Sequence, residues 1–148
     1  TLNVRGTSVQ LTGAGYDNWA EQFDNVRIFA SSGMDRLNVA DTADDDVLTT
    51  TATAVRVRSR LFDVTATNFD AGTFAAGTGN DTAELFDTSG DDLVEAQAAQ
   101  AILTNNQFTW TLNGYKKVRV CSVSGGTDRL RAGAVDFVLE QEGPWVPI

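Results

Sequence analysis

The chain has 148 residues, a hydrophobic fraction of 42% and a formal net charge of −9, from 20 acidic and 11 basic residues. Its length fits one ordinary domain, and its hydrophobic fraction is high enough for a buried core, which argues against a disordered chain. The acidic balance, with no Lys/Arg cluster to offset it, argues against a nucleic-acid partner and an anionic membrane surface. No apolar run is long enough to span a bilayer, so we expect no membrane insertion.

Histidine is absent, which removes the commonest general base and the commonest zinc ligand. The single cysteine, Cys121, can form neither an internal disulfide nor a thiolate metal site, and its apolar neighbours predict a small strand residue. A disulfide between identical subunits is the alternative. The chain starts at Thr1 without Met or a signal peptide, and Thr, Gly, Asp and Asn are frequent. We therefore expect a processed protein or a fragment of a longer chain, secreted or at a cell surface.

Short alternations of apolar and polar residues follow one another along the chain, and each predicts a strand with one buried face. Turns rich in Gly, Ser or Asp separate them. Only the Ala- and Gln-rich segment 95–103 is compatible with a helix, and its alignment with 49–57 predicts a strand instead. The clearest alternations lie at Val26–Ala30, Leu37–Val39, Val55–Arg58, Ala83–Leu85, Val118–Cys121 and Leu130–Ala132.

The pattern recurs after about 46 residues. Phe23-Asp24 is followed 46 residues later by Phe69-Asp70, and Gly33-x-Asp35 by Gly79-x-Asp81. A third copy carries Tyr115 at the position of Phe69. We predict one repeat domain over 1–148, with copies at 1–46, 47–92 and 93–139 and a tail at 140–148.

Each copy contains about four short strands, which is too little to bury an apolar face alone. We therefore predict an all-β fold, a β-solenoid similar to a parallel β-helix, in which each of three copies of about 46 residues forms one coil. The alternative is a β-sandwich to which the copies contribute hairpins. In the solenoid, equivalent aromatic residues are expected to stack in two columns, Tyr16/Phe62/Phe108 and Phe23/Phe69/Tyr115.

The segment from Gly79 to Asp92 carries a resemblance to a known kind of unit. Its turn Gly79-Asn80-Asp81 and its ending Asp87-Thr88-Ser89-Gly90-Asp91-Asp92 resemble tandem-repeat bacterial surface and extracellular proteins with FD-x-V, GG-x-D and A-x-L-x-D-S-x-G-D-D elements. The turn is also similar to calcium-binding Gly/Asp-rich repeats of secreted toxins and adhesins. The first copy departs from the pattern at Asp44, and the third loses the double Asp. The resemblance implies an extracellular scaffold, adhesion or matrix role and no enzyme activity.

Aspartates are the only polar residues that recur in groups at equivalent positions of the repeat. Stacked coils would bring these carboxylates together, and calcium is a hard cation that binds such oxygen ligands. The alternative is that they cap turns through backbone N–H groups. Because the chain has no nucleophile elbow, His-based triad, phosphate loop or zinc motif, and because the acidic positions repeat, we predict no enzyme and no certain cofactor. The candidate calcium ligands are Asp35, Asp41, Asp45, Asp46, Asp81, Asp87, Asp91 and Asp92.

A solenoid exposes unpaired strand edges at both ends, and no cap is visible in this sequence. We therefore predict head-to-tail association into a homo-oligomer, filament or layer, with Leu2 and Trp145 as contacts. The alternative for the tail is to fold over its own coil. The alternative function is an adhesin-type module that binds a glycan or a cell-surface protein, with Trp19, Trp110 and Trp145 as residues that could stack on sugars.

Overall fold

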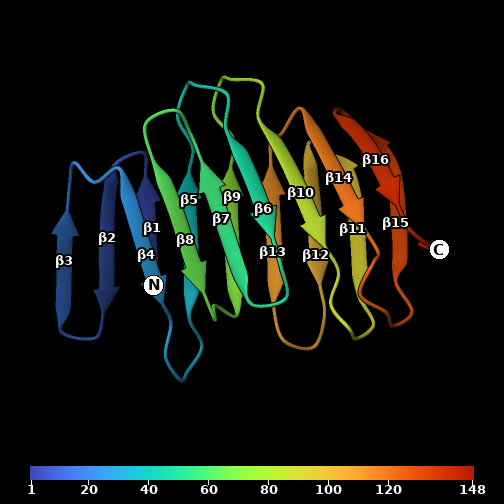
Figure 1. Ribbon diagram of the computed structural model, residues 1–148, viewed down its shortest axis with the longest axis horizontal. Coiled ribbons are helices and arrows are strands. Elements are labelled where there is room, and N and C mark those ends of the chain that lie inside the picture. The colour runs from blue at the N-terminus through green and yellow to red at the C-terminus, as the bar shows by residue number, and fades with distance from the viewer.

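The computed structural model describes all 148 residues, which form strands and turns without any helix (Figure 1). No segment therefore forms a helix long and apolar enough to cross a membrane. The segment 95–103 lies in two strands, as predicted. The strands are β1 (Leu2–Arg5), β2 (Ser8–Gly13), β3 (Tyr16–Ala20), β4 (Asn25–Phe29), β5 (Arg36–Ala40), β6 (Val47–Thr50), β7 (Ala54–Arg58), β8 (Asp63–Thr67), β9 (Ala71–Ala75), β10 (Thr82–Phe86), β11 (Leu93–Ala98), β12 (Gln100–Thr104), β13 (Thr109–Asn113), β14 (Lys117–Cys121), β15 (Arg129–Val135), β16 (Val138–Glu142) and β17 (Val146–Pro147).

The strands form two sheets that face each other along the long axis of the molecule (Figure 1). Sheet A has ten strands in the order β17-β15-β11-β12-β13-β9-β5-β1-β2-β3, and sheet B has seven in the order β16-β14-β10-β6-β7-β8-β4. Alternation along most strands turns one face inward, as in β10, where Ala83 and Leu85 are buried. The core contains 26 buried residues. Gly72 leaves room there for the rings of Phe74 and Trp110, which pack edge to face with centroids 6.0 Å apart.

The strand order has a period of five strands, which we call a unit: unit 1 is β1–β5, unit 2 is β6–β10 and unit 3 is β11–β15. Each unit begins with a three-stranded antiparallel meander, and its fourth strand crosses to the opposite sheet. Its fifth strand returns to the first sheet. Three connections per unit cross between the sheets, after the third, fourth and fifth strands, so each unit starts in the sheet opposite to the one where its predecessor started.

The predicted all-β solenoid is confirmed, as a stack of about four turns. Strands of consecutive units pair in parallel, as β4 with β8 and β9 with β13, whereas a sandwich of hairpins would pair antiparallel strands. One detail of the prediction is wrong, because equivalent positions 46 residues apart do not share a ladder. Leu2 pairs with Leu37, and Ala71 with Thr109. The physical reason is the alternation of sheets, which puts the strands after Phe62 and Phe108 in different layers.

Candidate functional site

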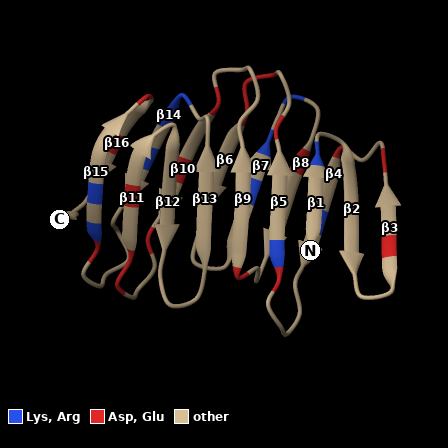
Figure 2. Ribbon diagram, turned by 180° about the vertical axis from the view of Figure 1, so that it is seen from behind, with Lys and Arg blue, Asp and Glu red and all other residues tan.

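The aspartates gather on the turns that connect the strands rather than on the flat sheet faces (Figure 2). Two turns matter most, the one between β5 and β6 and the one before β10. Because β6 and β10 are parallel neighbours, with Val47 opposite Thr82, the residues that precede them also lie side by side. The backbone N–H of Asp46 accordingly donates a hydrogen bond to Asp81 Oδ1 at 3.0 Å.

Three carboxylates meet at this place, and we call Asp41, Asp46 and Asp81 the first acidic cluster. One oxygen from each lies within 4.8 Å of the others. Asp46 is 1% exposed and Asp81 is 0% exposed, whereas Asp41 is half-buried. Thr42 donates its N–H to Asp41 Oδ1 at 2.8 Å and its hydroxyl to Asp46 Oδ2 at 3.0 Å. Asp41 Oδ2, Asp46 Oδ1 and Asp81 Oδ2 nevertheless have no hydrogen-bond partner.

The electrostatics of the first acidic cluster disfavour three negative charges. Burial, together with the neighbouring carboxyl group of Asp46, raises the pKa of Asp41 from 3.8 to about 8. Burial also raises the pKa of Asp81, and the negative charge of Asp46 adds to this effect. None of the ion pairs in the structure involves these carboxylates. The cluster therefore requires a proton or a cation to be stable at neutral pH.

A second acidic cluster, Asp87, Asp92 and Asp128, occupies the equivalent position one unit later. All three residues are buried, but side chains and backbone satisfy most of their oxygens. Asn105 Nδ2 donates to Asp92 Oδ1 at 2.9 Å, and the Ser122 hydroxyl donates to Asp128 Oδ2 at 2.6 Å. The N–H groups of residues 123 and 124 donate to Asp87 Oδ2. Only Asp87 Oδ1 remains without a partner.

The two clusters differ in their donors rather than in their carboxylates. Ala76 lies 46 residues before Ser122 and has no hydroxyl to offer to Asp81. Ser59 lies 46 residues before Asn105, and its own hydroxyl has no partner. The first acidic cluster thus keeps the three carboxylates but lacks the two donors, equivalent to Ser122 and Asn105, that satisfy oxygens of the second cluster.

Two of the three remaining predicted ligands, Asp45 and Asp91, serve as turn caps, which was the alternative interpretation of the aspartates. Asp45 Oδ1 accepts the N–H of Asn80 at 2.8 Å, and Asp91 Oδ1 accepts the N–H of Thr127 at 2.8 Å. Asp35 belongs to neither cluster, and its N–H donates to Asp70 at 2.7 Å. The sequence-based set omitted Asp128, although its offset of 47 residues from Asp81 was the available signal.

The two residues predicted as assembly contacts lie in the protein's own core, so that prediction is wrong. Leu2 is buried beside Leu37. Trp145 is buried as well, and its Nε1 donates to the carbonyl oxygen of Val120 at 3.3 Å. The reason is that the tail folds over its own coil, where β17 pairs with β15.

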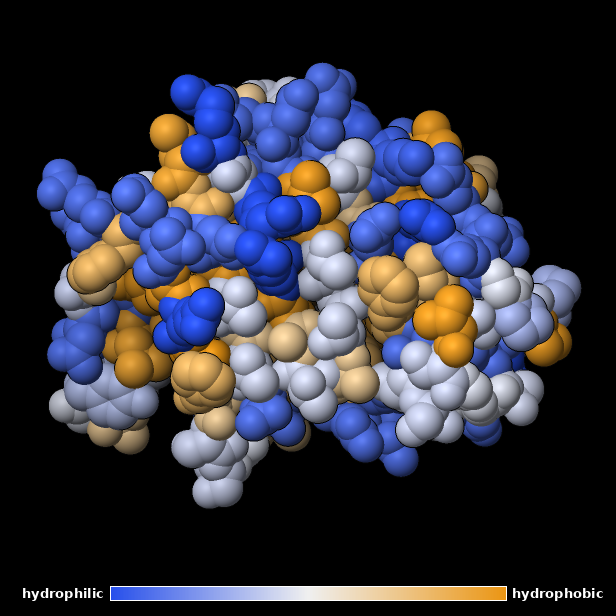
Figure 3. All heavy atoms as spheres, viewed as in Figure 1, coloured by the Kyte–Doolittle hydropathy of each residue, from blue (hydrophilic) through white to orange (hydrophobic).

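The edge strands β3 and β4 form one end of the stack, which we call the open end (Figure 1). It exposes aromatic residues whose equivalents in the later units are buried. Hydrophobic atoms, in orange, are visible on the surface at this end (Figure 3). Tyr16 is 49% exposed, whereas its equivalents Phe62 and Phe108 are 3% and 4% exposed. Phe23 is 48% exposed, whereas its equivalents Phe69 and Tyr115 are 9% and 5% exposed. The later residues are covered because a preceding unit lies over them.

A turn glycine shows the same difference. A Cβ added to Gly79 would lie 2.2 Å from the carbonyl oxygen of Asp44, and one on Gly126 would lie 2.0 Å from that of Gly90, in each case a turn of the preceding unit. A Cβ added to the equivalent Gly33 would have nothing within 4 Å. The open end therefore lacks a neighbour on both its strands and its turn.

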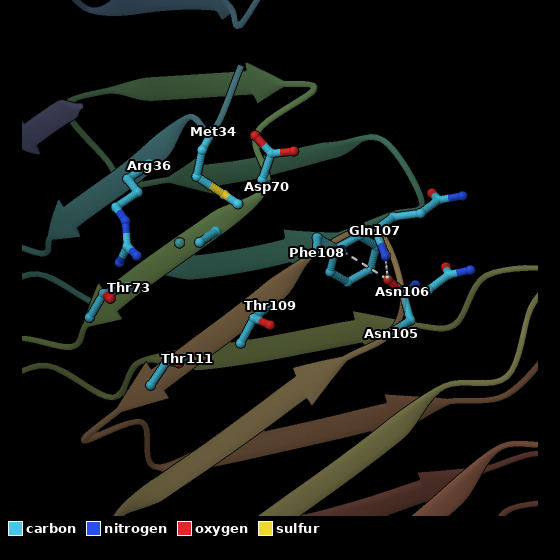
Figure 4. A pocket seen from close by; sticks show the side chains of 12 residues that line it. Met34, Arg36, Asp70, Thr73, Asn105, Asn106, Gln107, Phe108, Thr109 and Thr111 are labelled. Carbon is cyan, nitrogen blue, oxygen red and sulfur yellow. Dashed lines mark hydrogen bonds between the residues drawn. The ribbon is translucent and has the colours of Figure 1, made fainter. Parts of the chain in front are cut away.

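A shallow groove of about 560 Å³ crosses the outer face of β5, β9 and β13 (Figure 4). Met34 and Arg36 lie on one side, and the loop from Asn105 to Gln107 lies on the other. The Asn105 side-chain oxygen accepts the N–H groups of Gln107 and Phe108, so it already serves the loop. Met34 and Phe108 are the largest apolar side chains of a mainly polar lining.

Comparison of the chain with protein-family models, with curated proteins and with solved structures finds no match. The acidic clusters and the open end are thus the features from which a function can be inferred.

Proposed function

We propose that the protein is a structural subunit of an extracellular or cell-surface assembly, and that it associates head to tail with a second copy through the open end. The observation that carries the proposal is the exposure of Tyr16 and Phe23 at positions where Phe62 and Phe69 are covered by a preceding unit. Exposed aromatic residues beside an unpaired strand edge favour addition of another chain.

The opposite end of the molecule supports the proposal, because its last strand is of the kind that could pair with the free edge of β3. In units 2 and 3 the third strand pairs with the fourth strand of the preceding unit, as β8 with β4 and β13 with β9. β17 pairs with β15 as the fourth strands β9 and β14 pair with β5 and β10. The free edge of β17 therefore corresponds to the edge with which a fourth strand pairs to the third strand of the next unit. β3 is a third strand whose corresponding edge has no partner.

Pro147 faces the free edge of β17 and has no N–H, so this pairing would lack one backbone donor, but the flanking side chains can still meet. The β9–β13 register, applied to β17 and β3, places Val146 of one copy opposite Asp17 of the next and Ile148 opposite Trp19. Ile148 and Trp19 are both exposed hydrophobic residues in the isolated chain. Such a contact joins two different surfaces and does not close on itself, so repetition gives a fibre.

The adhesin-type alternative has less support. Trp110 and Trp145 are buried, which leaves Trp19 at the open end as the exposed tryptophan for stacking on a glycan. In the groove beside Met34, the side-chain amide of Asn105 is already engaged within the protein.

The proposal can be tested by intermolecular cross-linking. Asp17→Cys and Val146→Cys place thiols on adjacent parallel strands, at a separation that a disulfide can bridge. We expect the double variant to form a ladder of multimers on a non-reducing gel, and a control pair, Leu61→Cys with Val146→Cys, to remain monomeric. Leu61 is similarly exposed but lies on a turn of unit 2.

Sedimentation velocity over a concentration series and electron microscopy provide the second measurement. The native chain is expected to associate with rising concentration, and Trp19→Lys with Phe29→Lys is expected to be monomeric, because lysine at strand edges opposes pairing. A native protein that is strictly monomeric at millimolar concentration, with no cross-linked ladder, would refute head-to-tail association.

A further inference from the structure

We propose that Asp41, Asp46 and Asp81 bind one divalent cation of the calcium type, and that the equivalent cluster of Asp87, Asp92 and Asp128 binds none. The proposal goes beyond the assembly role and is independent of it. It concerns a site inside one chain, between the turn after β5 and the turn before β10.

The first observation is that three neighbouring carboxylates each have a buried oxygen without a hydrogen-bond partner. Asp46 and Asp81 are almost completely buried, and each has one oxygen with no hydrogen-bond partner. Buried polar atoms are nearly always satisfied by protein, water or an ion, so an unpaired set of this kind indicates a missing partner. Asp41 Oδ2 adds a third such atom to the same place.

A single proton does not complete the cluster. A proton shared between Asp41 and Asp46 would satisfy one oxygen on each of these two residues. Asp81 Oδ2 would still lack a partner, although Asp81 is fully buried. A cation interacts with all three carboxylates at once.

The ligand set selects the class of cation. All three ligands are carboxylate oxygens, which hard cations prefer, and neither nitrogen nor sulfur is available. The oxygens lie within 4.8 Å of one another. Calcium binds oxygen at roughly 2.3–2.6 Å, so two ligands on opposite sides of the ion are about 5 Å apart. Magnesium requires shorter bonds, of roughly 2.0–2.1 Å, and a stricter octahedron. We therefore expect magnesium to bind this site more weakly than calcium.

The second acidic cluster is an internal control. It has the same three carboxylates at equivalent positions, but Ser122 and Asn105 donate hydrogen bonds to Asp128 and Asp92. These donors occupy the oxygens that a cation would use. We therefore expect one calcium ion per chain rather than two.

The experiment is isothermal titration calorimetry of the chelator-treated chain with calcium chloride, and in parallel with magnesium chloride. We expect one calcium per chain, weaker binding of magnesium, and a Tm that rises with calcium concentration. Asp41→Asn is expected to weaken calcium binding by about tenfold or more, and its match in the second cluster, Asp87→Asn, to leave calcium affinity unchanged.

A second variant tests the site without removing any of its three carboxylates. Ala76→Ser with Ser59→Asn gives the first cluster the donors of the second, so it should lose calcium binding and gain thermal stability in chelator. Absence of binding to the native chain at millimolar calcium would overturn the proposal. Binding of two ions, or loss of binding in Asp87→Asn, would overturn the assignment to the first cluster.

Discussion

Replacing the equivalent aromatic residues of two units measures how much a preceding unit stabilises its successor. Phe62→Ala removes a ring that is 3% exposed, and Tyr16→Ala removes one that is 49% exposed at the open end. Both rings lie at the start of the third strand of a unit, so the local backbone context is matched. The variants differ mainly in whether a preceding unit covers the side chain.

The expected magnitudes follow from burial. Truncation of a fully buried phenylalanine lowers the free energy of unfolding by about 3–5 kcal/mol, because transfer energy is lost and a cavity remains. Complete burial of such a side chain is worth roughly 1.5–3 kcal/mol, and about half of the Tyr16 surface is already in water. Tyr16→Ala should therefore cost about 1 kcal/mol. Phe108→Ala should lie at the upper end of the range for Phe62→Ala, because Phe108 stacks on Trp110 with centroids 4.8 Å apart.

Urea denaturation followed by tryptophan fluorescence is the assay, at low micromolar concentration so that association does not contribute. The denaturant slope should be unchanged in all three variants, which makes the midpoints comparable. Equal losses for Tyr16→Ala and Phe62→Ala would refute the reasoning, because they would mean that the Tyr16 ring is covered in the isolated chain.

Three further predictions concern single positions. Ser122→Ala should lower the free energy of unfolding by about 1–3 kcal/mol in urea, because Asp128 keeps its burial and loses its hydroxyl partner. Gly114 has a φ of 80° and its equivalent Gln22 a φ of 65°, so Gly114→Ala should cost about 1 kcal/mol by the same measurement, whereas Gln22→Gly should be neutral or stabilising. Cys121 is buried, and burial raises the pKa of its thiol, so a thiol reagent should label it slowly in the folded protein and rapidly in urea.

Strand positions were predictable because they depend on local pattern. Alternation in segments such as Val118–Cys121 corresponds to one buried face, and the turn glycines separate the strands as expected. The equivalence of Asp41 with Asp87 was also visible, because residue type is kept at a constant offset.

The donors around the acidic clusters were not predictable, because they come from elsewhere in the chain. Asn105 reaches Asp92 from the turn before β13, and Ser122 reaches Asp128 from the end of β14. Which acidic cluster lacks partners is consequently a property of strand pairing, and a search for carboxylate motifs treats the two clusters alike.

The sequence by itself determined the all-β character, the positions of the clearest strands and the 46-residue period, since each of these follows from side-chain type along the chain, whereas the expected four strands per copy are five in the structure. The tertiary structure decided which strands pair and which residues remain exposed. The fifth strand of the first unit returns to the sheet of its first strand, so Leu2 pairs with Leu37 and is buried instead of remaining available to another subunit. Pairing between distant strands depends on backbone hydrogen bonds that every residue offers equally, and only packing of the whole stack selects among them.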